Sequence, residues 1–462
     1  MNAIIVSAIL GVVLMFSSWM VSSKTTQKNI ALVGLFVLFI ANLAQMRGWY
    51  VMSVDTKGML AFTEYGLFVN TLIYFLSFLY VWINADEVAA IGDHAADFYA
   101  LFFFILCGVA VLTSFQNLLM LFIGIEIVSI PLYILTGSDK KNLLSNEASL
   151  KYFLMGSFST GVLLLGITLY YGANGTFSLI NPDIILSKNN HSNERFLLSA
   201  GLILLFAAMN FKVSSAPFHF WTPDVYDGAP TVFTSFMASI VKSTIFIAFA
   251  SIFQLQSKNL GTSWSLLFNF VVFATLFFGN ITAIFQRSVK RMMAYSSIAQ
   301  AGFMLFAVYN VTAYATEGLL LYITVYSLAS IGVFAVLIKM KDYSFEAFNG
   351  LAKQDPLLAF LMAVFLLSLA GIPLTGGFFA KFYMLNAAYT GGVSIAMIVI
   401  AILFAAISVY YYFKIIQAMY FAEGTPSIKE LPVGYKSKLI ILAALIVLLG
   451  VIPTYLFNYL YF

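Results

Sequence analysis

Four ionisable residues lie inside long apolar stretches of the chain, where a charge is costly. Glu126 lies within LLMLFIGIEIVSIPLYIL, and Lys212, Lys242 and Lys381 lie in three further apolar segments. A charge at the centre of a bilayer costs about 2.5–3.5 kcal/mol on the insertion scale unless it faces protein or water. Carboxyl and amine groups at this depth are typical of ion and proton pathways.

A buried amine beside a carboxylate can act as a proton-exchange element. Desolvation disfavours the charged amine, whereas a carboxylate about 4 Å away, at an effective dielectric of ~20, favours it by roughly 4 kcal/mol. Moving such a pair together or apart would therefore load or release a proton, and we expect Glu126 and Lys212 to form this pair. The alternative is a static salt bridge between helices, but one carboxylate among several lysines leaves too many cations for that to be the whole account.

The composition indicates that these residues belong to a membrane protein. The 462-residue chain is 62% hydrophobic and 9% charged, whereas a soluble domain is about 25% charged. An all-α polytopic membrane protein is therefore predicted, and a soluble enzyme is excluded. The single cysteine, Cys107, permits no internal disulfide, and the histidines are too far apart to suggest a metal site. The net charge of +4 is spread over loops and does not indicate nucleic-acid binding.

Apolar runs of about 20 residues predict about fourteen transmembrane helices. The predicted spans are roughly 2–21, 29–46, 59–83, 97–115, 117–136, 147–170, 196–221, 229–254, 263–285, 292–309, 315–338, 356–388, 392–421 and 435–460. We read the first span as retained in the protein, since it lacks a basic leader and a clear cleavage site.

Two of the predicted spans contain proline or glycine breaks. Pro217 follows Lys212 by five residues, and Pro373, within SLAGIPLTGGFFAKFYML, precedes Lys381. Proline removes a backbone donor and clashes one turn back, so each helix should break there. A pair of interrupted apolar segments predicts an internal repeat with one broken helix in each unit.

We therefore expect two inverted five-helix repeats, formed by spans 4–8 and 9–13. The predicted divisions are 1–96 for helices 1–3, 97–254 for the first repeat, 263–421 for the second, and 422–462 for a loop and the last helix.

Lysine and arginine in the loops set the expected orientation. If the N-terminus lies outside, the inner loops hold most of these residues, including Lys24, Lys140 and Arg287, whereas the outer loops hold fewer, including Arg47 and Lys57. Both termini are therefore predicted to be periplasmic.

Two further residues are possible members of a relay. Lys151 follows Glu147 by four residues, the favourable order for an ion pair within one helix, so a pathway role and ordinary snorkelling are both open. His219 lies beside the first break and titrates near neutral pH, with an unperturbed pKa of about 6.5, but a structural histidine is an equal alternative.

Three other charged residues have ordinary explanations. Lys414, in YYYFKIIQ, is expected to snorkel among tyrosines. Asp224 and Asp227 are expected to cap the next helix or to surround the inner entrance of a pathway.

Several long segments resemble the antiporter-like, proton-translocating subunits of respiratory complex I. They are GIEIVSIPLYIL, EASLKYFLMGS, FKVSSAPFHFWTPDVYDGAP, VKRMMAYSSIAQAGF and SLAGIPLTGGFFAKFYML, and they extend over residues 117–388. The resemblance implies that Glu126 and Lys212 are the partners on the fifth and the broken seventh helix. It also implies that Lys242 is the central lysine of the eighth helix, Lys381 the exit-side lysine of the broken twelfth, and Lys151 the lysine of the sixth.

One position departs from the family pattern. Many relatives carry histidine where this chain has Gln300, and glutamine cannot titrate. A histidine relay is therefore in doubt at this point, and a water ordered by Gln300 is the expected replacement.

The resemblance implies a non-redox subunit of a proton-pumping NADH:quinone oxidoreductase in the bacterial inner membrane. No Cys cluster or phosphate-binding glycine loop is present, so FMN, iron–sulfur clusters and quinone are expected in partner subunits. The expected partners are other membrane subunits, including an antiporter-like neighbour, the peripheral redox arm and the lipid bilayer. Two alternatives remain: a subunit of a multisubunit cation/proton antiporter or membrane-bound hydrogenase, and a non-conducting scaffold.

Overall fold

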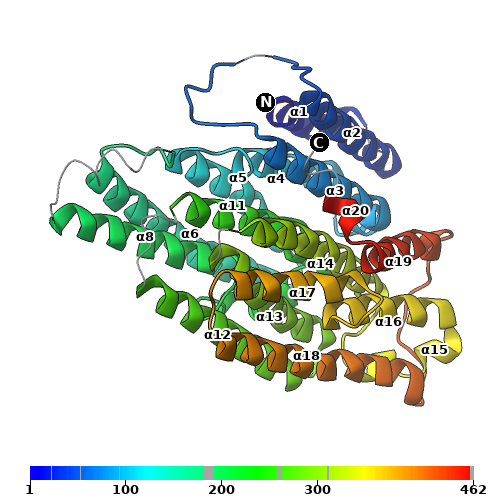
Figure 1. Ribbon diagram of the computed structural model, residues 1–462. Helices are drawn as coiled ribbons and strands as arrows, with labels where there is room; N and C mark the ends of the chain where they lie inside the picture. Colours follow the sequence, from blue (N-terminus) through cyan, green and yellow to red (C-terminus); the bar gives the residue numbers. More distant parts are fainter. Residues whose placement is uncertain are drawn as a thin grey trace. The chain divides into compact units, whose positions relative to one another are not determined.

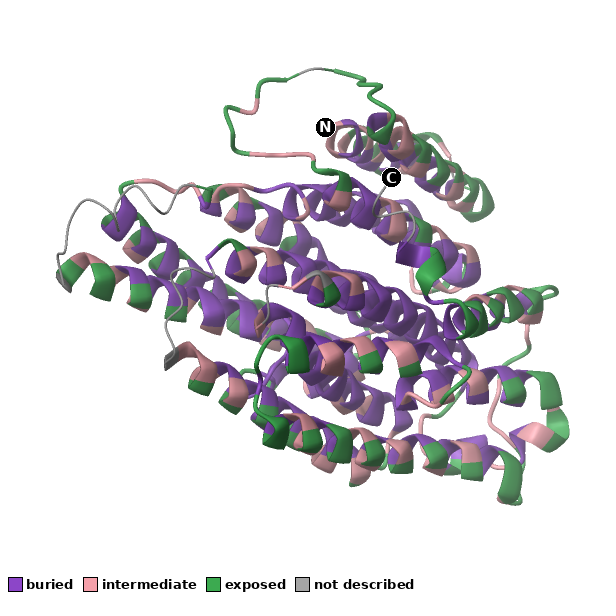
Figure 2. Ribbon diagram, in the orientation of Figure 1, coloured by how far each residue is buried: buried purple, intermediate pink, exposed green. Residues whose placement is uncertain are grey.

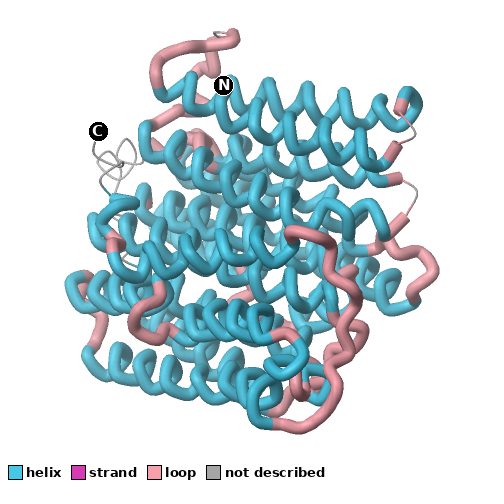
Figure 3. Tube along the Cα trace, turned by 90° about the vertical axis from the view of Figure 1, so that its right-hand side faces the viewer, coloured by secondary structure: helices cyan, strands magenta, loops and turns pink. Residues whose placement is uncertain are grey.

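The computed structural model describes residues 1–21, 23–52, 54–92, 94–180, 192–256, 263–309 and 312–457. Figure 3 shows these residues as helices joined by loops, with no strand among them. Twelve helices in the described residues are long and apolar enough to cross a membrane. The predicted all-α membrane protein is therefore confirmed.

The difference from the fourteen predicted spans lies in two places. The predicted span 356–388 is divided into α16 (Pro356–Ala370) and α17 (Gly376–Thr390), each of 15 residues. The last predicted span contains α19 (Tyr435–Val451), of 17 residues, and residues 458–460 at its end lie outside the described part. A helix that crosses a bilayer alone needs about 20 residues, so neither segment meets that length by itself.

The contacts divide the chain into two compact units. The first comprises residues 1–78, 88–214 and 244–260, and the second comprises residues 79–87, 215–243 and 261–462. Two helices, α3 (Glu64–Ala90) and α11 (Lys242–Leu255), contribute to both units. The boundaries of the inverted repeats, 97–254 and 263–421, stay a prediction.

The first unit is built from six helices that lie wholly within it. They are α1 (Asn2–Met20), α2 (Lys24–Met46), α4 (Ala95–Leu112), α5 (Leu118–Thr136), α6 (Leu143–Asn174) and α8 (Ser192–Lys212). Helices α6 and α8 lie side by side (Figure 1). A Cβ on Gly166 would come within 3.0 Å of the Gly201 carbonyl oxygen, and one on Gly201 within 2.9 Å of the Gly166 oxygen. Small residues at both positions therefore let the two backbones approach closely, as is common between membrane helices.

The second unit surrounds α14 (Ala313–Lys339), whose most apolar 18-residue window is entirely buried (Figure 2). Helices α16, α17 and α19 all pack against α14. The other elements of this unit are α9 (Trp221–Gly228), α10 (Thr231–Phe236), the π turn η1 (Met237–Val241), α12 (Ser263–Ile284), α13 (Val289–Tyr309), η3 (Glu346–Phe348), α15 (Leu351–Gln354), α18 (Ile395–Phe421) and α20 (Thr454–Phe457).

Both predicted broken helices are present. Helix α8 ends at Lys212, so the predicted helix 196–221 stops earlier than expected, and α9 begins at Trp221. Helix α16 ends at Ala370, and α17 begins after Thr375. Each break contains a non-glycine residue with a left-handed backbone, Ser214 with φ 64° and Leu374 with φ 74°. Such conformations are uncommon for non-glycine residues, and they cluster at functional sites.

Candidate functional site

Glu126 lies in the middle of α5 and is half-buried. The Thr160 hydroxyl of α6 donates a hydrogen bond to its Oε1 at 2.8 Å. Residues three apart on a helix lie on one face, so Ser129 lies on the same face of α5, one turn further on. The Glu126 carboxylate is thus hydrogen-bonded by Thr160 of α6, and the Ser129 hydroxyl lies one turn away on α5.

Lys212 lies in the last turn of α8, beside the first break. Its Nζ donates to the Ser129 hydroxyl at 3.1 Å, and it lies within the electrostatic influence of Glu126. A cation at a helix C-terminus is also favoured by the helix dipole. The structure therefore brings the two predicted partners together, with Ser129 as the direct acceptor of the amine.

Ser129→Ala is expected to slow proton transfer through this pair about tenfold. The substitution removes the acceptor of the Lys212 amine, and one hydrogen bond to a charged group contributes about 1.5 kcal/mol or more. Proton translocation by the assembled complex in vesicles would measure the change. The matched control is Ser157→Ala, an exposed serine on the neighbouring helix α6, which should behave as wild type. Equal rates in the two variants would show that Ser129 has no part in the transfer.

Lys242 directly follows the π turn η1 and is only 3% exposed. Its Nζ donates to the Ser297 carbonyl oxygen at 2.7 Å and to the Ser297 hydroxyl at 3.2 Å, both on α13. Single π turns inside α-helices are frequent at functional sites. Both acceptors of the Lys242 amine are therefore neutral groups. Among the described residues, no carboxylate forms a direct ion pair with it.

Lys381 lies on α17, after the second break, and is 7% exposed. Its Nζ donates to the Ala370 carbonyl oxygen at 2.8 Å and to the Ser408 hydroxyl at 3.5 Å, and it lies 5.1 Å from the centre of the Phe303 ring. The last carbonyls of a helix have no partner within it, so the end of α16 provides an acceptor for this amine. The break and the lysine therefore form one structural element.

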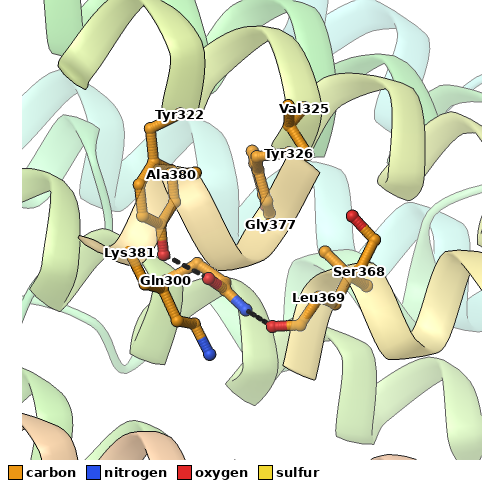
Figure 4. Close-up of a pocket in the computed structure, with 9 residues that line it drawn as sticks. All are labelled: Gln300, Tyr322, Val325, Tyr326, Ser368, Leu369, Gly377, Ala380 and Lys381. Atoms are coloured by element: carbon orange, nitrogen blue, oxygen red, sulfur yellow. Dashed lines mark hydrogen bonds between the residues drawn. The ribbon is translucent and has the colours of Figure 1, made fainter. Parts of the chain in front are cut away.

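Gln300 lies on α13 and is held by three hydrogen bonds. Figure 4 shows those to Leu369 and Tyr322. The Gln300 Nε2 donates to the Leu369 carbonyl oxygen at 2.9 Å and to the Tyr412 hydroxyl at 3.1 Å, and the Tyr322 hydroxyl donates to its Oε1. It borders a cavity of about 10 Å³ that Lys381 also lines. This volume is roughly what one water molecule needs, so the cavity has room for the water expected at Gln300. The water itself stays a prediction.

The two other possible relay residues have well-defined surroundings. His219 is 4% exposed and stacks on Phe220 and Phe278, with ring centres 4.4 and 5.5 Å away. Its Nδ1 has no hydrogen-bond partner in the described part of the chain. Lys151 pairs with Glu147 at 2.7 Å, as the four-residue spacing predicts, and its side chain is 43% exposed.

Asp224 and Asp227 do not cap the following helix, so the capping alternative is wrong, whereas their place at the inner entrance of a pathway stays a prediction. Helix α10 has no side-chain cap, whereas Arg291 on α13 binds Asp224 at 2.9 Å and approaches Asp227 at 3.7 Å. Lys290, next to it, donates to the carbonyl oxygens of Asp227 and Ala229 at the end of α9. The start of α13 therefore fixes α9, the helix that follows the first break.

The candidate residues divide between the two compact units. Glu126, Lys151 and Lys212 lie in the first, and Lys242 and Lys381 lie in the second. Gln300, His219, Pro217 and Pro373 also belong to the second unit. Within the described residues, no three His, Cys, Asp or Glu side chains are grouped as a metal site would need.

Sequence reasoning missed the hydroxyl groups that contact these charged residues. Ser129 was within reach of such reasoning, because it is three residues from Glu126 on the same helical face. Thr160, Ser297, Tyr412 and Ser408 gave no signal, since each reaches its partner from another helix.

The family model described as NADH:quinone oxidoreductase/Mrp antiporter, TM, matches residues 116–409. A protein of Cytophaga hutchinsonii named NADH-quinone oxidoreductase subunit N is 39% identical over 459 residues, covering 98% of each chain. A protein of the same name from Flavobacterium psychrophilum is 36% identical, again with 98% of each chain covered.

Solved structures show the same arrangement of helices. A chain of respiratory complex I from Thermus thermophilus, solved with bound aureothin, matches with a TM-score of 0.83 and 28% identity, covering 98% of this chain and 97% of that one. A chain of the Mrp complex from Dietzia has a TM-score of 0.82 at 16% identity, covering 100% of this chain and 96% of that one. The second likeness concerns the fold alone.

Proposed function

The chain belongs to the NADH:quinone oxidoreductase/Mrp antiporter membrane family, and we propose that it works as subunit N of a bacterial NADH-quinone oxidoreductase. In this role it is a proton-translocating subunit of a multisubunit respiratory membrane complex. The observation that carries the proposal is the burial of Lys242 and Lys381 in membrane-length or broken helices, each satisfied by neutral hydrogen-bond acceptors. An amine in such surroundings can give up its proton without leaving a carboxylate unpaired.

The first step is assigned to Glu126 and Lys212. Ser129 accepts a hydrogen bond from the Lys212 amine, and the carboxylate of Glu126 attracts that amine when it is charged. A small movement of α8 relative to α5 changes the distance between carboxylate and amine, and with it the strength of this effect. The pair therefore takes up a proton in one position and releases it in the other.

The later steps are assigned to Lys242 and Lys381. Lys242 accepts the proton within a fully buried region of α11, and Lys381 releases it beside the second break. Lys151 and His219 stand as possible additional relay members. Protons enter from the cytoplasmic side and leave on the periplasmic side, with both termini periplasmic and the protein in the inner membrane.

The driving redox chemistry lies elsewhere in the complex. We assign FMN, the iron–sulfur clusters and quinone to partner subunits, and the contacts of this chain to an antiporter-like neighbour, small membrane subunits and the lipid bilayer. This chain supplies the proton route and no redox centre of its own.

The proposal predicts that Lys212→Ala or Glu126→Ala lowers the number of protons pumped per electron in the assembled complex. Each change removes one member of the pair whose separation controls protonation. The rate of proton transfer through this pair should therefore fall at least about tenfold. Proton uptake by vesicles at matched rates of NADH oxidation measures it. Exposed Lys141→Ala provides the control. Normal pumping at normal electron flux in both pair variants would reject the role.

A cation/proton antiporter subunit is a weaker second candidate. The family model and the Mrp likeness leave it open, but the relatives that match almost the whole chain carry the oxidoreductase name. Purifying the native complex distinguishes the two, since only an oxidoreductase would copurify with FMN and oxidise NADH.

A further inference from the structure

Helix α19 lies directly against the backbone of the second break. A Cβ on Gly450 of α19 would lie 2.5 Å from the Leu374 carbonyl oxygen and 2.7 Å from the Thr375 Cα. One turn earlier on the same face of α19, the Ile446 carbonyl oxygen would lie 3.3 Å from a Cβ on Gly376. Glycine at positions 450 and 376 therefore lets α19 and the break approach backbone to backbone, as small residues commonly do between membrane helices.

The break that α19 contacts is also the one that holds the Lys381 side chain. The Lys381 amine donates to the Ala370 carbonyl oxygen at 2.8 Å, whereas the Ser408 hydroxyl is a more distant acceptor at 3.5 Å. A Cβ on Gly371 would come within 2.8 Å of the Lys381 Cδ, so the stem of the lysine lies across the first residue of the break. The position of the break backbone therefore determines where this amine lies.

The opposite end of α19 is bound to the start of α16. Lys436 forms an ion pair with Asp355 at 2.7 Å, and Asp355 caps α16 by accepting a hydrogen bond from the Leu358 N–H at 3.1 Å. The stretch of α19 from Lys436 to Gly450 is about 21 Å long, and the 15 residues of α16 cover about the same length. Helix α19 therefore contacts α16 at its start and the break that follows its end.

Two further hydrogen bonds fix the first turn of α19. The Tyr435 hydroxyl donates to the Ala335 carbonyl oxygen of α14 at 2.8 Å, and the Lys438 amine donates to the Trp82 carbonyl oxygen of α3 at 2.6 Å. The most apolar window of α14 is entirely buried. The first turn of α19 is thus tied to a helix at the centre of the second unit.

The first break is supported in another way. The Ala216 N–H donates to the Thr275 hydroxyl of α12 at 3.0 Å, so a side chain holds the backbone there. At the second break, the contact at Gly450 is between two backbones. The two breaks therefore differ in what supports them, and α19 supports the one beside Lys381.

We propose that α19 is a strut that fixes the second break, and that Gly450 is a positioning residue for Lys381. This inference rests on the proposed function of the chain, because it concerns the last lysine of the relay. The strut keeps the Ala370 carbonyl oxygen within reach of the Lys381 amine. A displacement of about 1 Å would break this bond of 2.8 Å, since N–H···O bonds in proteins extend to about 3.2 Å.

Ordinary helix packing is the competing explanation. In that case α19 only buries apolar surface, and a substitution at Gly450 lowers the amount of complex without changing how each assembled complex works. The strut predicts instead that the complexes that do assemble pump fewer protons, because the break and the Lys381 amine have moved. The two explanations therefore differ in protons pumped per electron, measured on equal amounts of complex.

Gly450→Ala in the assembled complex, reconstituted in vesicles, is the test. The added Cβ displaces α19 from the Leu374 carbonyl oxygen. Protons pumped per electron, at a matched rate of NADH oxidation, should fall by at least half of the loss seen in Lys381→Ala. The matched control is Ala444→Val, which enlarges an exposed side chain on the same helix and should pump as wild type.

The double variant Gly450→Ala/Lys381→Ala shows whether the effect passes through the lysine. A residue that acts only by positioning Lys381 has nothing to position once that side chain is gone. The double variant should therefore lose no more pumping than Lys381→Ala alone, because effects within one coupled element do not add. Losses that add would place the effect of Gly450 elsewhere and contradict the positioning role.

Wild-type pumping in Gly450→Ala, alongside lost pumping in Lys381→Ala, would overturn the strut and leave the proposed function intact. Wild-type pumping in both would count against the proposed function as well.

If Gly450→Ala does not assemble, the double variant Lys436→Gln/Lys438→Gln decides. It weakens the attachment of the first turn of α19 and adds no atoms at the break. Pumping should fall in this variant and stay near the wild-type level in Lys436→Arg/Lys438→Arg, which keeps both charges. Unchanged pumping in the glutamine variant would overturn the strut.

Discussion

Replacing Lys242 with alanine is expected to abolish proton translocation by this subunit while the complex still assembles. Lys242 is 3% exposed, and the bonds of its amine in the described structure go to one carbonyl and one hydroxyl of Ser297. Its removal leaves two neutral acceptors, of which the carbonyl can be satisfied by water, so the cost to folding should be small. The cost to transport should be complete, because no other titrating group is bonded at this point. Proton uptake by vesicles, at a measured rate of NADH oxidation, gives the result.

Lys242→Arg separates a proton-carrying role from a purely electrostatic one. Arginine keeps the positive charge and the hydrogen-bond donors, but it does not lose its proton in proteins. If Lys242 only neutralises or orients its surroundings, arginine should restore pumping at least in part. Restoration would contradict the relay, whereas continued loss with intact assembly would support it.

Gly377→Ala is expected to prevent stable assembly. A Cβ at this position in α17 would lie 1.7 Å from the backbone oxygen and 2.7 Å from the backbone carbon of Ser368 in α16. Neither atom belongs to a flexible side chain, so the two halves of the broken helix would have to move apart. Overpacking in a close-packed interior commonly costs about 1–3 kcal/mol, and a clash with backbone exceeds this range. The amount of the subunit in purified membranes, and the melting temperature of any complex recovered, would measure the effect.

The control for this prediction is Gly161→Ala on α6. A Cβ there meets nothing within 4 Å, so the change should be neutral or slightly stabilising, because alanine is the better helix former. If Gly377→Ala were present in the same amount as Gly161→Ala and the wild type, α16 and α17 would not be held in close contact at the second break.

The sequence predicted the helices well where the signal is local. Apolar runs of membrane length indicate α5 and α14 directly, and the prolines indicate both breaks. Boundaries near the breaks were less accurate: α8 ends at Lys212, nine residues before the predicted end of its span. The chain leaves the helix as soon as Ser214 adopts a left-handed backbone, and neither composition nor periodicity indicates that conformation in advance.

The charged members of the site were predictable, but their neutral partners were not. Glu126, Lys212, Lys242 and Lys381 are conspicuous because charge is rare and expensive in apolar segments. A serine or tyrosine costs far less there, so Ser297 and Tyr412 do not stand out from the many hydroxyl residues of the chain. Their contacts depend on how α11, α13 and α18 pack, which is long-range information.

The π turn at Met237–Val241 also affects how this region should be compared between sequences. A π turn accommodates about one residue more than an α turn, so residues after it are rotated by roughly 100° from an uninterrupted α-helix. A helical wheel drawn from Thr231 would therefore place Lys242 and everything after it on the wrong side. Alignments that cross Val241 need a one-residue gap wherever a homologous helix is regular, or the lysine will be paired with a neighbour that faces elsewhere.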